Sequence, residues 1–370
     1  MNYNRIYVAA TSQHVGKTTS TLGLVHALRQ RGLNVGYCKP VGQKALRFGD
    51  YFADKDAVLF ADFMNFEAQP DLHSPVILGK GATKAFLDNP AQYSFTNKVV
   101  KASKILQQRH DVVVYEGTGH PGVGSVVNLS NAKVAELLGA GMIMVVEAGI
   151  GSTIDSLDLN LSVFEQKKIP IIGVIVNKAI RSKIDDVRYY VGRKLEERGI
   201  RLLGIMPYEE ELGLPLMGTV CSAIKGKVLY NKEYMTNRVE GMLAGSLIDY
   251  DSIQKSKNHL LVVSVNRLED ALKKLESVNK RLGPAENQEN PLAGIILTGK
   301  NELPESAVSY FEEHKIPVIM SMMDTYESVI KISQIEVKIN TKTPWKVKKA
   351  VSLFQEHVDL RPVFDTEELA

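Results

Sequence analysis

Cysteine is scarce in this chain, with two in 370 residues, and no hydrophobic run approaches the length of a membrane span. Cys38 and Cys221 do not support a disulfide framework, so a reducing compartment is expected. Both thiols lie among apolar or small residues, which favours buried structural roles over reactive ones. The first residues also lack the charged and apolar regions of a signal peptide. These absences favour a cytoplasmic protein with no membrane partner.

An excess of charge of either sign is also missing. The 45 Lys and Arg residues nearly balance the 42 Asp and Glu residues, which gives a formal net charge of +3. No overall field therefore attracts nucleic acid or an anionic membrane, and small-molecule chemistry is favoured. A chain of 370 residues is too long for one ordinary domain and fits two.

A phosphate-binding loop is the strongest signal in the sequence. The β-rich run Arg5–Ala9 precedes the loop, and a helical pattern over Thr19–Arg31 follows it. At its end, Gly16-Lys17-Thr18, backbone amides and a helix N-terminus face phosphates, Lys17 neutralises charge and Thr18 binds Mg²⁺. The strict pattern starts with glycine where Thr11 stands, so this loop is a variant; the alternative is a chance loop before a helix. The residues expected to contact the nucleotide here are Thr11, Ser12, Gln13, His14, Val15, Gly16, Lys17, Thr18 and Thr19.

Apolar, β-branched runs alternate with longer amphipathic runs in the first half of the chain, which is an α/β pattern. This predicts a P-loop NTPase-type, mostly parallel sheet with helices on both faces. The strand pattern lapses around Ala223–Glu233, so the first domain is expected at residues 1–225 and a smaller α/β domain at 234–370. The further strands expected in the first domain are Val35–Lys39, Val112–Tyr115, Met142–Val146, Ile171–Val176 and Leu202–Met206.

The second domain repeats the alternation without repeating the sequence. Its polar segment Gly283–Pro291 contains two prolines and is expected to be a surface loop. The strands expected are Leu260–Val265, Gly294–Leu297, Pro317–Met320 and a short one near Val337–Ile339. The helices expected are Leu268–Arg281, Glu305–His314, Tyr326–Ile332 and Pro344–Glu356.

Charged residues follow the predicted strands at the edge where open α/β sheets bind ligands. Lys39 ends the second strand and can add a second cation to a triphosphate, although an exposed strand-end lysine is the alternative. Asp54 and Asp56 precede an apolar helical run. Each can cap that helix, or one of them can complete a Mg²⁺ shell, for which Asp56 is the better candidate.

A glycine-rich loop follows the buried run Asp111–Tyr115. It begins with Glu116, which matches the second acidic Mg²⁺ element of P-loop proteins, and its glycines let backbone approach a ligand. His120 in this loop is either a substrate contact or a surface residue. Asn177 ends another strand, where its amide can pair with a purine edge.

These residues resemble dethiobiotin synthetase and its relatives among the cobyrinic acid a,c-diamide synthases. The longer run through Ser125 is similar to the dethiobiotin-synthetase-like N-terminal region of long bacterial phosphotransacetylases, in which a DRTGG domain follows. Short segments of the second domain look similar to that DRTGG domain, although its name-giving motif is absent. The residues that carry the resemblance are Val15-Gly16-Lys17-Thr18, Lys39-Pro40-Val41, Asp54–Leu59, Ser74-Pro75-Val76, Glu116–Ser125, Asn177, Ala244-Gly245-Ser246, Leu297-Thr298-Gly299 and Asp324–Glu327.

The resemblance implies ATP and Mg²⁺ as cofactors and a homodimer as the assembly. It makes Lys17 and Lys39 phosphate ligands, and it assigns Thr18, Asp56 and Glu116 to the Mg²⁺ site. Lys17, Lys39 and Glu116 are then the expected catalytic residues. Asn177 becomes an adenine contact, and the turn at Pro207 would lie beside the base. Ala10 stands where dethiobiotin synthetases carry glycine, so the loop is expected to be tighter around the phosphates.

Two functions of different class follow from this resemblance. One is phosphoryl transfer from Mg·ATP to a small carboxylate or carbamate in a ligase-type reaction, with ATP hydrolysis. The other is a nucleotide-dependent regulatory or sensor module, in which the second domain or a partner reads the nucleotide state. Retention of Lys17 and both acidic elements favours turnover, whereas the likeness to a regulatory region favours the second. The acceptor or effector stays open.

Overall fold

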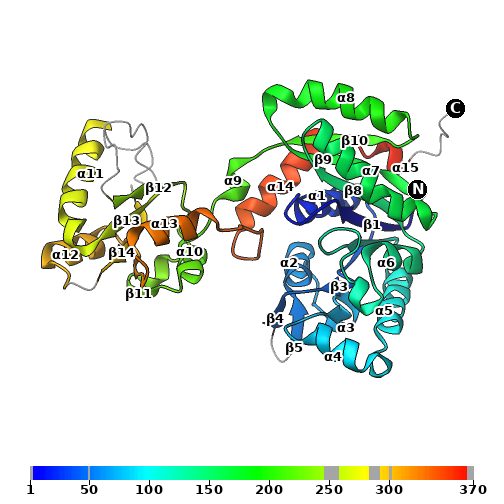
Figure 1. Cartoon of the computed structure of the whole chain (residues 1–370), viewed down its shortest axis with the longest axis horizontal. Helices are drawn as coiled ribbons and strands as arrows, with labels where there is room; N and C mark the ends of the chain where they lie inside the picture. Colours follow the sequence, from blue (N-terminus) through cyan, green and yellow to red (C-terminus); the bar gives the residue numbers. More distant parts are fainter. Residues whose placement is uncertain (1–2, 49–50, 246–257, 283–291, 300–301, 365–370) are drawn as a thin grey trace. The chain divides into compact units, whose positions relative to one another are not determined.

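A computed structural model describes residues 3–48, 51–245, 258–282, 292–299 and 302–364 (Figure 1). They form two compact units: unit 2 is Glu210–Lys338, and unit 1 consists of the residues before and after it. The expected linear split, 1–225 against 234–370, therefore differs from the structure. The first unit ends earlier along the chain than expected, and the segment from Ile339 onward returns to it.

Unit 1 is built on a six-stranded sheet of order β10-β9-β8-β1-β7-β2 in which every pair is parallel. Its central strands are buried on both faces, which explains their almost unbroken apolar sequences. Tyr7 and Ala9 of β1 face one core, while Ile6 and Val8 are equally buried on the opposite face. The strands are β1 (Arg5–Ala10), β2 (Val35–Cys38), β7 (Val112–Glu116), β8 (Gly141–Glu147), β9 (Ile171–Ala179) and β10 (Leu202–Pro207).

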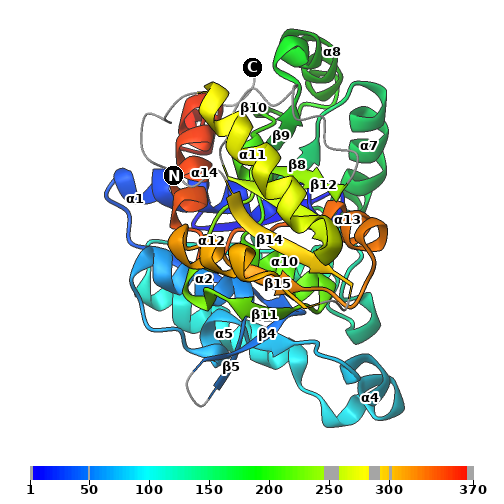
Figure 2. The ribbon, with the colours of Figure 1, turned by 90° about the vertical axis from the view of Figure 1, so that its left-hand side faces the viewer.

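Helices cover both faces of this sheet, which confirms the predicted fold class (Figure 2). Helices α5, α6, α7 and α8 contribute to the core that contains Tyr7. The helices of unit 1 are α1 (Lys17–Gln30), α2 (Lys55–Met64), α3 (Pro70–His73), α4 (Ala82–Asp88), α5 (Phe95–Arg109), α6 (Asn131–Leu138), α7 (Gly151–Gln166), α8 (Ile184–Glu196), α14 (Pro344–His357) and α15 (Arg361–Phe364).

Unit 1 also contains two small two-stranded sheets. One pairs β3 (Val41–Gly42) with β6 (Val76–Ile77) in parallel. The other pairs β4 (Ala45–Phe48) with β5 (Tyr51–Asp54) as an antiparallel ribbon that leads directly into α2. Strands β3, β4 and β5 carry the chain from Lys39 to the acidic residues at the start of α2.

The C-terminal segment packs against the helix that follows the phosphate-binding loop. Phe354 of α14 is 1% exposed and touches α1 where Gly23 leaves room: a Cβ on Gly23 would lie 2.1 Å from the Phe354 Cβ. The Asp359 amide then donates to the Leu203 carbonyl of β10 at 2.7 Å. The last helices therefore complete unit 1 by covering α1 and the edge strand.

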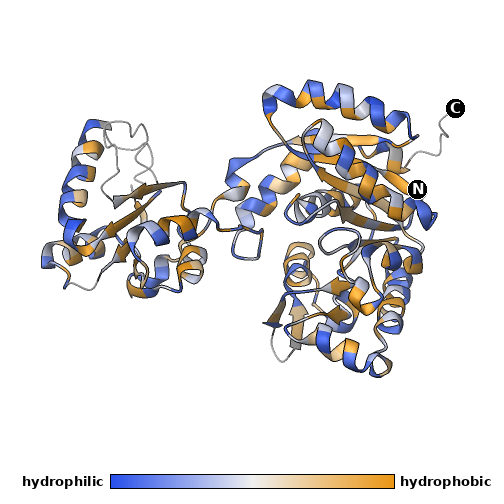
Figure 3. Ribbon diagram, viewed as in Figure 1, coloured by the Kyte–Doolittle hydropathy of each residue, from blue (hydrophilic) through white to orange (hydrophobic). Residues whose placement is uncertain are grey.

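Unit 2 contains a mixed five-stranded sheet of order β11-β15-β14-β13-β12, in which only β11 is antiparallel to its neighbour. Figure 3 shows apolar strands and an α11 whose residues alternate in hydropathy, as expected for a helix with one buried face. The strands are β11 (Lys227–Tyr230), β12 (Gly241–Ala244), β13 (His259–Ser264), β14 (Leu292–Thr298) and β15 (Val318–Met320). The helices are α9 (Glu210–Gly213), α10 (Met217–Ile224), α11 (Leu268–Leu282), α12 (Glu305–Glu313) and α13 (Thr325–Ser333).

Most of the elements predicted for the second domain form, including the three-residue strand β15, and the exceptions are short. The expected strand at Val337–Ile339 does not form, because this segment is the irregular connection that leads back to unit 1. Strands β11 and β12 were not predicted; each has four residues, most of them half-buried, so neither shows the apolar run of the buried strands. The expected loop Gly283–Pro291 lies outside the described residues. In the part of the chain that the structure describes, no helix is long and apolar enough to span a membrane.

Candidate nucleotide-binding site

The loop between β1 and α1 has the backbone shape of a phosphate cradle. His14 and Gly16 adopt left-handed conformations, with φ of 62° and 103°, and α1 begins at the next residue, Lys17. Alternation of such conformations turns successive N–H groups toward one concavity, where an anion also meets the helix N-terminus. A Cβ at residue 16 would lie 1.9 Å from the Asn177 Nδ2, so only glycine fits.

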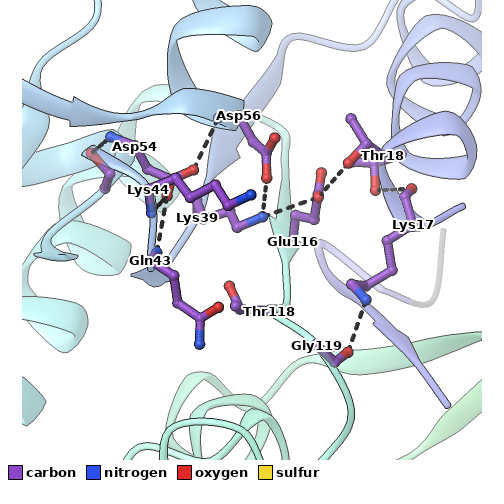
Figure 4. A network of polar contacts seen from close by, with 12 residues as sticks. Lys17, Thr18, Lys39, Gln43, Lys44, Asp54, Asp56, Glu116, Thr118 and Gly119 are labelled. Atoms are coloured by element: carbon purple, nitrogen blue, oxygen red, sulfur yellow. Dashed lines mark hydrogen bonds and ion pairs between the residues drawn. The ribbon is translucent and has the colours of Figure 1, made fainter. Parts of the chain in front are cut away.

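Lys17 and Thr18 face the loop that follows β7 (Figure 4). The Lys17 Nζ donates to the Gly119 carbonyl at 2.8 Å and to the Ser12 carbonyl at 3.3 Å. The Thr18 Oγ1 donates to Glu116 Oε1 at 3.0 Å. Thr18 is therefore bonded to the second acidic element, Glu116, and Lys17 to the loop that follows it.

Three charged side chains from three separate elements meet beside Thr18. The Lys39 Nζ, just beyond β2, forms an ion pair with Asp56 Oδ2 in the first turn of α2 and with Glu116 Oε1 at the end of β7, the latter at 3.2 Å. The side chains of Lys39, Asp56 and Glu116 are only 6, 13 and 1% exposed. The structure thus brings together the residues that the sequence predicted for phosphate and metal binding.

Burial and pairing determine the protonation of this cluster. Burial lowers the pKa of Lys39, but the adjacent Asp56 and Glu116 carboxylates outweigh it and raise that pKa, so the ammonium is retained. Burial raises the pKa of Glu116, and the Lys39 charge only partly opposes this. Both carboxylates therefore pair with the same Lys39 ammonium, and an additional cation would stabilise their ionised forms.

Asp54 has a structural role, which confirms the capping alternative for this residue. It is 2% exposed, and its Oδ1 accepts from the Asp56 amide at 2.9 Å as the N-cap of α2. Its Oδ2 accepts from the amides of Gln43 and Lys44 at 3.2 and 3.3 Å. Because both oxygens are engaged, Asp54 orients the turn that presents Asp56.

Asn177 contacts the phosphate-binding loop itself. Its Nδ2 donates to the Val15 carbonyl at 2.7 Å, and the side chain is 5% exposed. Pro207 is buried at the end of β10, where the next amide, of Tyr208, donates to the Ala179 carbonyl at 2.8 Å. The adenine contacts expected of Asn177 and Pro207 stay predictions. The side chain of His120 is exposed, and its Nδ1 accepts from the Gly122 amide. Its role as a substrate contact or as a surface residue stays open.

Two polar residues of the site were missed from the sequence. The Tyr37 hydroxyl donates to Glu116 Oε2 at 3.4 Å, and its ring stacks on Phe60 with centroids 3.8 Å apart. Asn131, the first residue of α6, bonds to the loop after β7. No signal near either residue points to the site, because their partners lie 79 and 13 residues away.

The donor set suits magnesium bound together with a nucleotide. Among the described residues, no group of three or more His, Cys, Asp or Glu side chains could hold a metal alone. Thr18, Asp56 and Glu116 instead supply a few hard oxygens. Mg²⁺ is usually held in this way, by one or two carboxylates, several waters and substrate phosphates.

Comparison with known families assigns each of two parts of the chain to a family. The family described as AAA domain matches residues 4–215, which is more than half of the chain, and the DRTGG domain matches residues 219–335. The DRTGG match ends close to Lys338, the last residue of unit 2. This agrees with the corrected domain division at that end.

Curated relatives include the proteins that the sequence resembled. A phosphate acetyltransferase of Nitratidesulfovibrio vulgaris is 23% identical, covering 96% of this chain and 50% of the relative. A probable cobyric acid synthase of Methanocaldococcus jannaschii is 26% identical, covering 57% of this chain and 46% of the relative. An ATP-dependent dethiobiotin synthetase of Clostridium kluyveri is 28% identical, covering 47% of this chain and 73% of the relative.

The chain spans about half the length of the phosphate acetyltransferases that it matches. Among solved structures, the MinD cell division protein of Aquifex aeolicus is similar, with 18% identity and a TM-score of 0.36 over 56% of this chain and 84% of MinD.

The residues of the phosphate-binding loop and of both acidic elements lie within the AAA-domain match. The chain therefore belongs to the AAA-domain family over residues 4–215, a P-loop NTPase fold, and carries a DRTGG domain over residues 219–335.

Proposed function

We propose that unit 1 binds Mg·ATP and transfers its γ-phosphoryl group to a small carboxylate or carbamate, in a synthetase-type reaction that also hydrolyses ATP. The observation that carries this proposal is the connected network of Thr18, Lys39, Asp56 and Glu116, beside which Lys17 bonds to the Gly119 carbonyl of the loop that follows Glu116. Phosphoryl transfer needs little more from a protein than positioning and charge neutralisation. This network has the groups for both.

Each residue of the network has a role in this reaction. The amides of the loop and the Lys17 ammonium would bind the β- and γ-phosphates. Lys39 would neutralise charge on the transferring group. Thr18, Asp56 and Glu116 would hold Mg²⁺, which when bound neutralises phosphate charge and aligns the oxygens. Tyr37 would orient Glu116 through its hydroxyl.

The acceptor class rests on the relatives rather than on the geometry. A protein named ATP-dependent dethiobiotin synthetase and one named probable cobyric acid synthase match 47% and 57% of this chain. Both names describe syntheses, so an acceptor activated by phosphorylation and then consumed by ligation is proposed for this chain. We place this reaction in the cytoplasm. We also propose that the protein is a homodimer, which light scattering would test.

The test is a titration of Mg·ATP into wild type and Lys17→Ala, followed by turnover assays. Charged hydrogen bonds contribute about 1.5–3 kcal/mol each, so the substitution should weaken affinity by about 10- to 100-fold. Lys44→Ala removes a nearby exposed lysine outside the network and should bind normally. Equal affinity of Lys17→Ala and wild type would refute the site.

Turnover separates the transfer step from binding. Glu116→Gln should keep most of the affinity but lower kcat more than it raises KM, because the carboxylate acts through the metal on the reacting phosphate. ATP consumption is measured with and without a panel of small carboxylates, diamines with bicarbonate, and acyl-CoA compounds. An unchanged rate in Glu116→Gln would make this residue structural.

The second candidate function is a nucleotide-dependent regulatory module. It is favoured by the match to phosphate acetyltransferase, which covers 96% of this chain but only 50% of the relative. In that case unit 2 would read the nucleotide state. The same assays discriminate: nucleotide binding without turnover under any acceptor condition would support the regulatory function.

A further inference from the structure

One buried carboxamide ties the glycine-rich loop after β7 to strand β1. Asn131 is 3% exposed at the first position of α6. Its Oδ1 accepts from the Tyr7 hydroxyl at 2.8 Å and from the Thr118 amide at 3.0 Å. Its Nδ2 donates to the carbonyls of Thr118 at 2.8 Å and His120 at 2.6 Å. Both lone pairs and both N–H groups of the amide are therefore used.

The loop closes tightly around this side chain. A Cβ on Gly117 would lie 2.7 Å from Asn131 Oδ1 and 3.1 Å from the ring of Tyr7. The Thr118 Oγ1 donates to the Val41 carbonyl in β3, so the loop is also bonded to this strand. A buried network whose members are all satisfied holds one geometry, because any displacement leaves polar groups without partners.

The loop that Asn131 holds is connected to the reacting groups at two points. Glu116 immediately precedes Gly117 in the chain. The Gly119 carbonyl, between the two carbonyls that Asn131 binds, accepts from the Lys17 Nζ at 2.8 Å. The polar atoms of Asn131 bond to Tyr7, Thr118 and His120. None of these bonds is to a charged residue of the site.

We propose that Asn131 is the positioning residue that holds the loop from Glu116 to His120 in register, so that Lys17 and Glu116 are aligned for phosphoryl transfer. The proposal rests on the proposed function for its catalytic consequence. Misplacement of a reacting group by about 1 Å can cost about 100-fold in rate. Loss of the amide should therefore appear in kcat rather than in nucleotide affinity, which the loop before α1 supplies.

The test uses two substitutions at this position and two controls in the full chain. Asn131→Ala removes all four hydrogen bonds, and Asn131→Asp keeps the shape but turns a carboxylate toward two carbonyls. Both should lower the kcat for ATP by about 10- to 100-fold, with KM changed less than about threefold. Tyr7→Phe leaves the loop contacts intact and should lower kcat much less. Lys133→Ala, an exposed change on the same helix, should leave kcat unchanged.

Hydrogen exchange without nucleotide provides a readout that does not depend on activity. Amides of the segment 117–124 should exchange faster in both Asn131 variants, while those of the central strands stay protected. Unchanged loop protection, or equal losses of kcat in Asn131→Ala and Lys133→Ala, would overturn the proposal. If wild type neither binds nor consumes ATP, the proposed function fails and the catalytic role of Asn131 fails with it; the exchange result then still decides whether Asn131 holds the loop.

Discussion

The packing of α14 on α1 predicts that Phe354 is one of the largest single contributors to the stability of unit 1. Its side chain is 1% exposed and fills the space beside Gly23. Truncation of a buried Phe to Ala costs about 3–5 kcal/mol, against a total of about 5–15 kcal/mol for a typical protein. Phe354→Ala should therefore remove a large share of the stability.

Thermal unfolding of the full chain measures this effect. For a unit of this size, each kcal/mol lowers Tm by about 2–4 °C, so a fall of about 6–20 °C is expected. Ser352→Ala changes an exposed residue of the same helix, whose hydroxyl bonds only to Glu356, and should stay within about 0.5 kcal/mol of wild type. The transition of unit 2 should not move in either variant.

A deletion extends the same reasoning to the domain boundary. A fragment of residues 1–225 lacks α14, so it should be less stable than a chain in which residues 210–338 are replaced by a flexible linker of about ten residues. This reverses the expectation that a cut near Ala223–Glu233 leaves an independent first domain. If Phe354→Ala unfolds at the wild-type temperature, or if fragment 1–225 is as stable as the linked chain, α14 contributes little to unit 1.

Three further predictions follow from the site and its surroundings. Gly16→Ala should weaken Mg·ATP binding by about tenfold or more in calorimetry, because the new Cβ would collide with Asn177 in a left-handed backbone; unchanged affinity would contradict the loop geometry. Lys39→Ala should bind Mn²⁺ without nucleotide about tenfold or more tightly than wild type in spin-resonance titrations, because both buried carboxylates lose the ammonium with which they form ion pairs; Lys44→Ala should not. Burial lowers the pKa of His73 to about 4, so the unfolded chain takes up this proton first as the pH falls from about 6.5, and stability is lost toward pH 4 by up to a few kcal/mol; urea unfolding of His73→Gln should show a flatter pH dependence in that window, and an equally steep one would exclude His73 as the cause.

The sequence alone determined the features that depend on neighbouring residues. A β-rich run, a Gly-Lys-Thr turn and a helical pattern identify the phosphate-binding loop, because all three lie within about 30 residues of the chain. Long buried strands such as β7 are recognisable because a parallel sheet covered on both faces needs an unbroken apolar run. Lys39 and Glu116 were found because parallel strands end at one edge of a sheet, and Asp56 because it starts an apolar helical run.

The tertiary structure alone decided which distant groups satisfy one another. The amphipathic pattern of α14 predicts a helix but not its partner, and only packing against Gly23 assigns it to unit 1 rather than unit 2. Asp54 and Asp56 both precede the same helical run and the sequence only favours Asp56 for the metal. In the structure, Asp54 accepts from the Gln43 and Lys44 amides, whereas Asp56 pairs with Lys39. Asn131 is an ordinary helix start until the fold places its amide against Tyr7 and Thr118. Hydrogen bonds and steric contacts are pairwise and short-ranged, so partners far apart in the chain become visible only once the chain is folded.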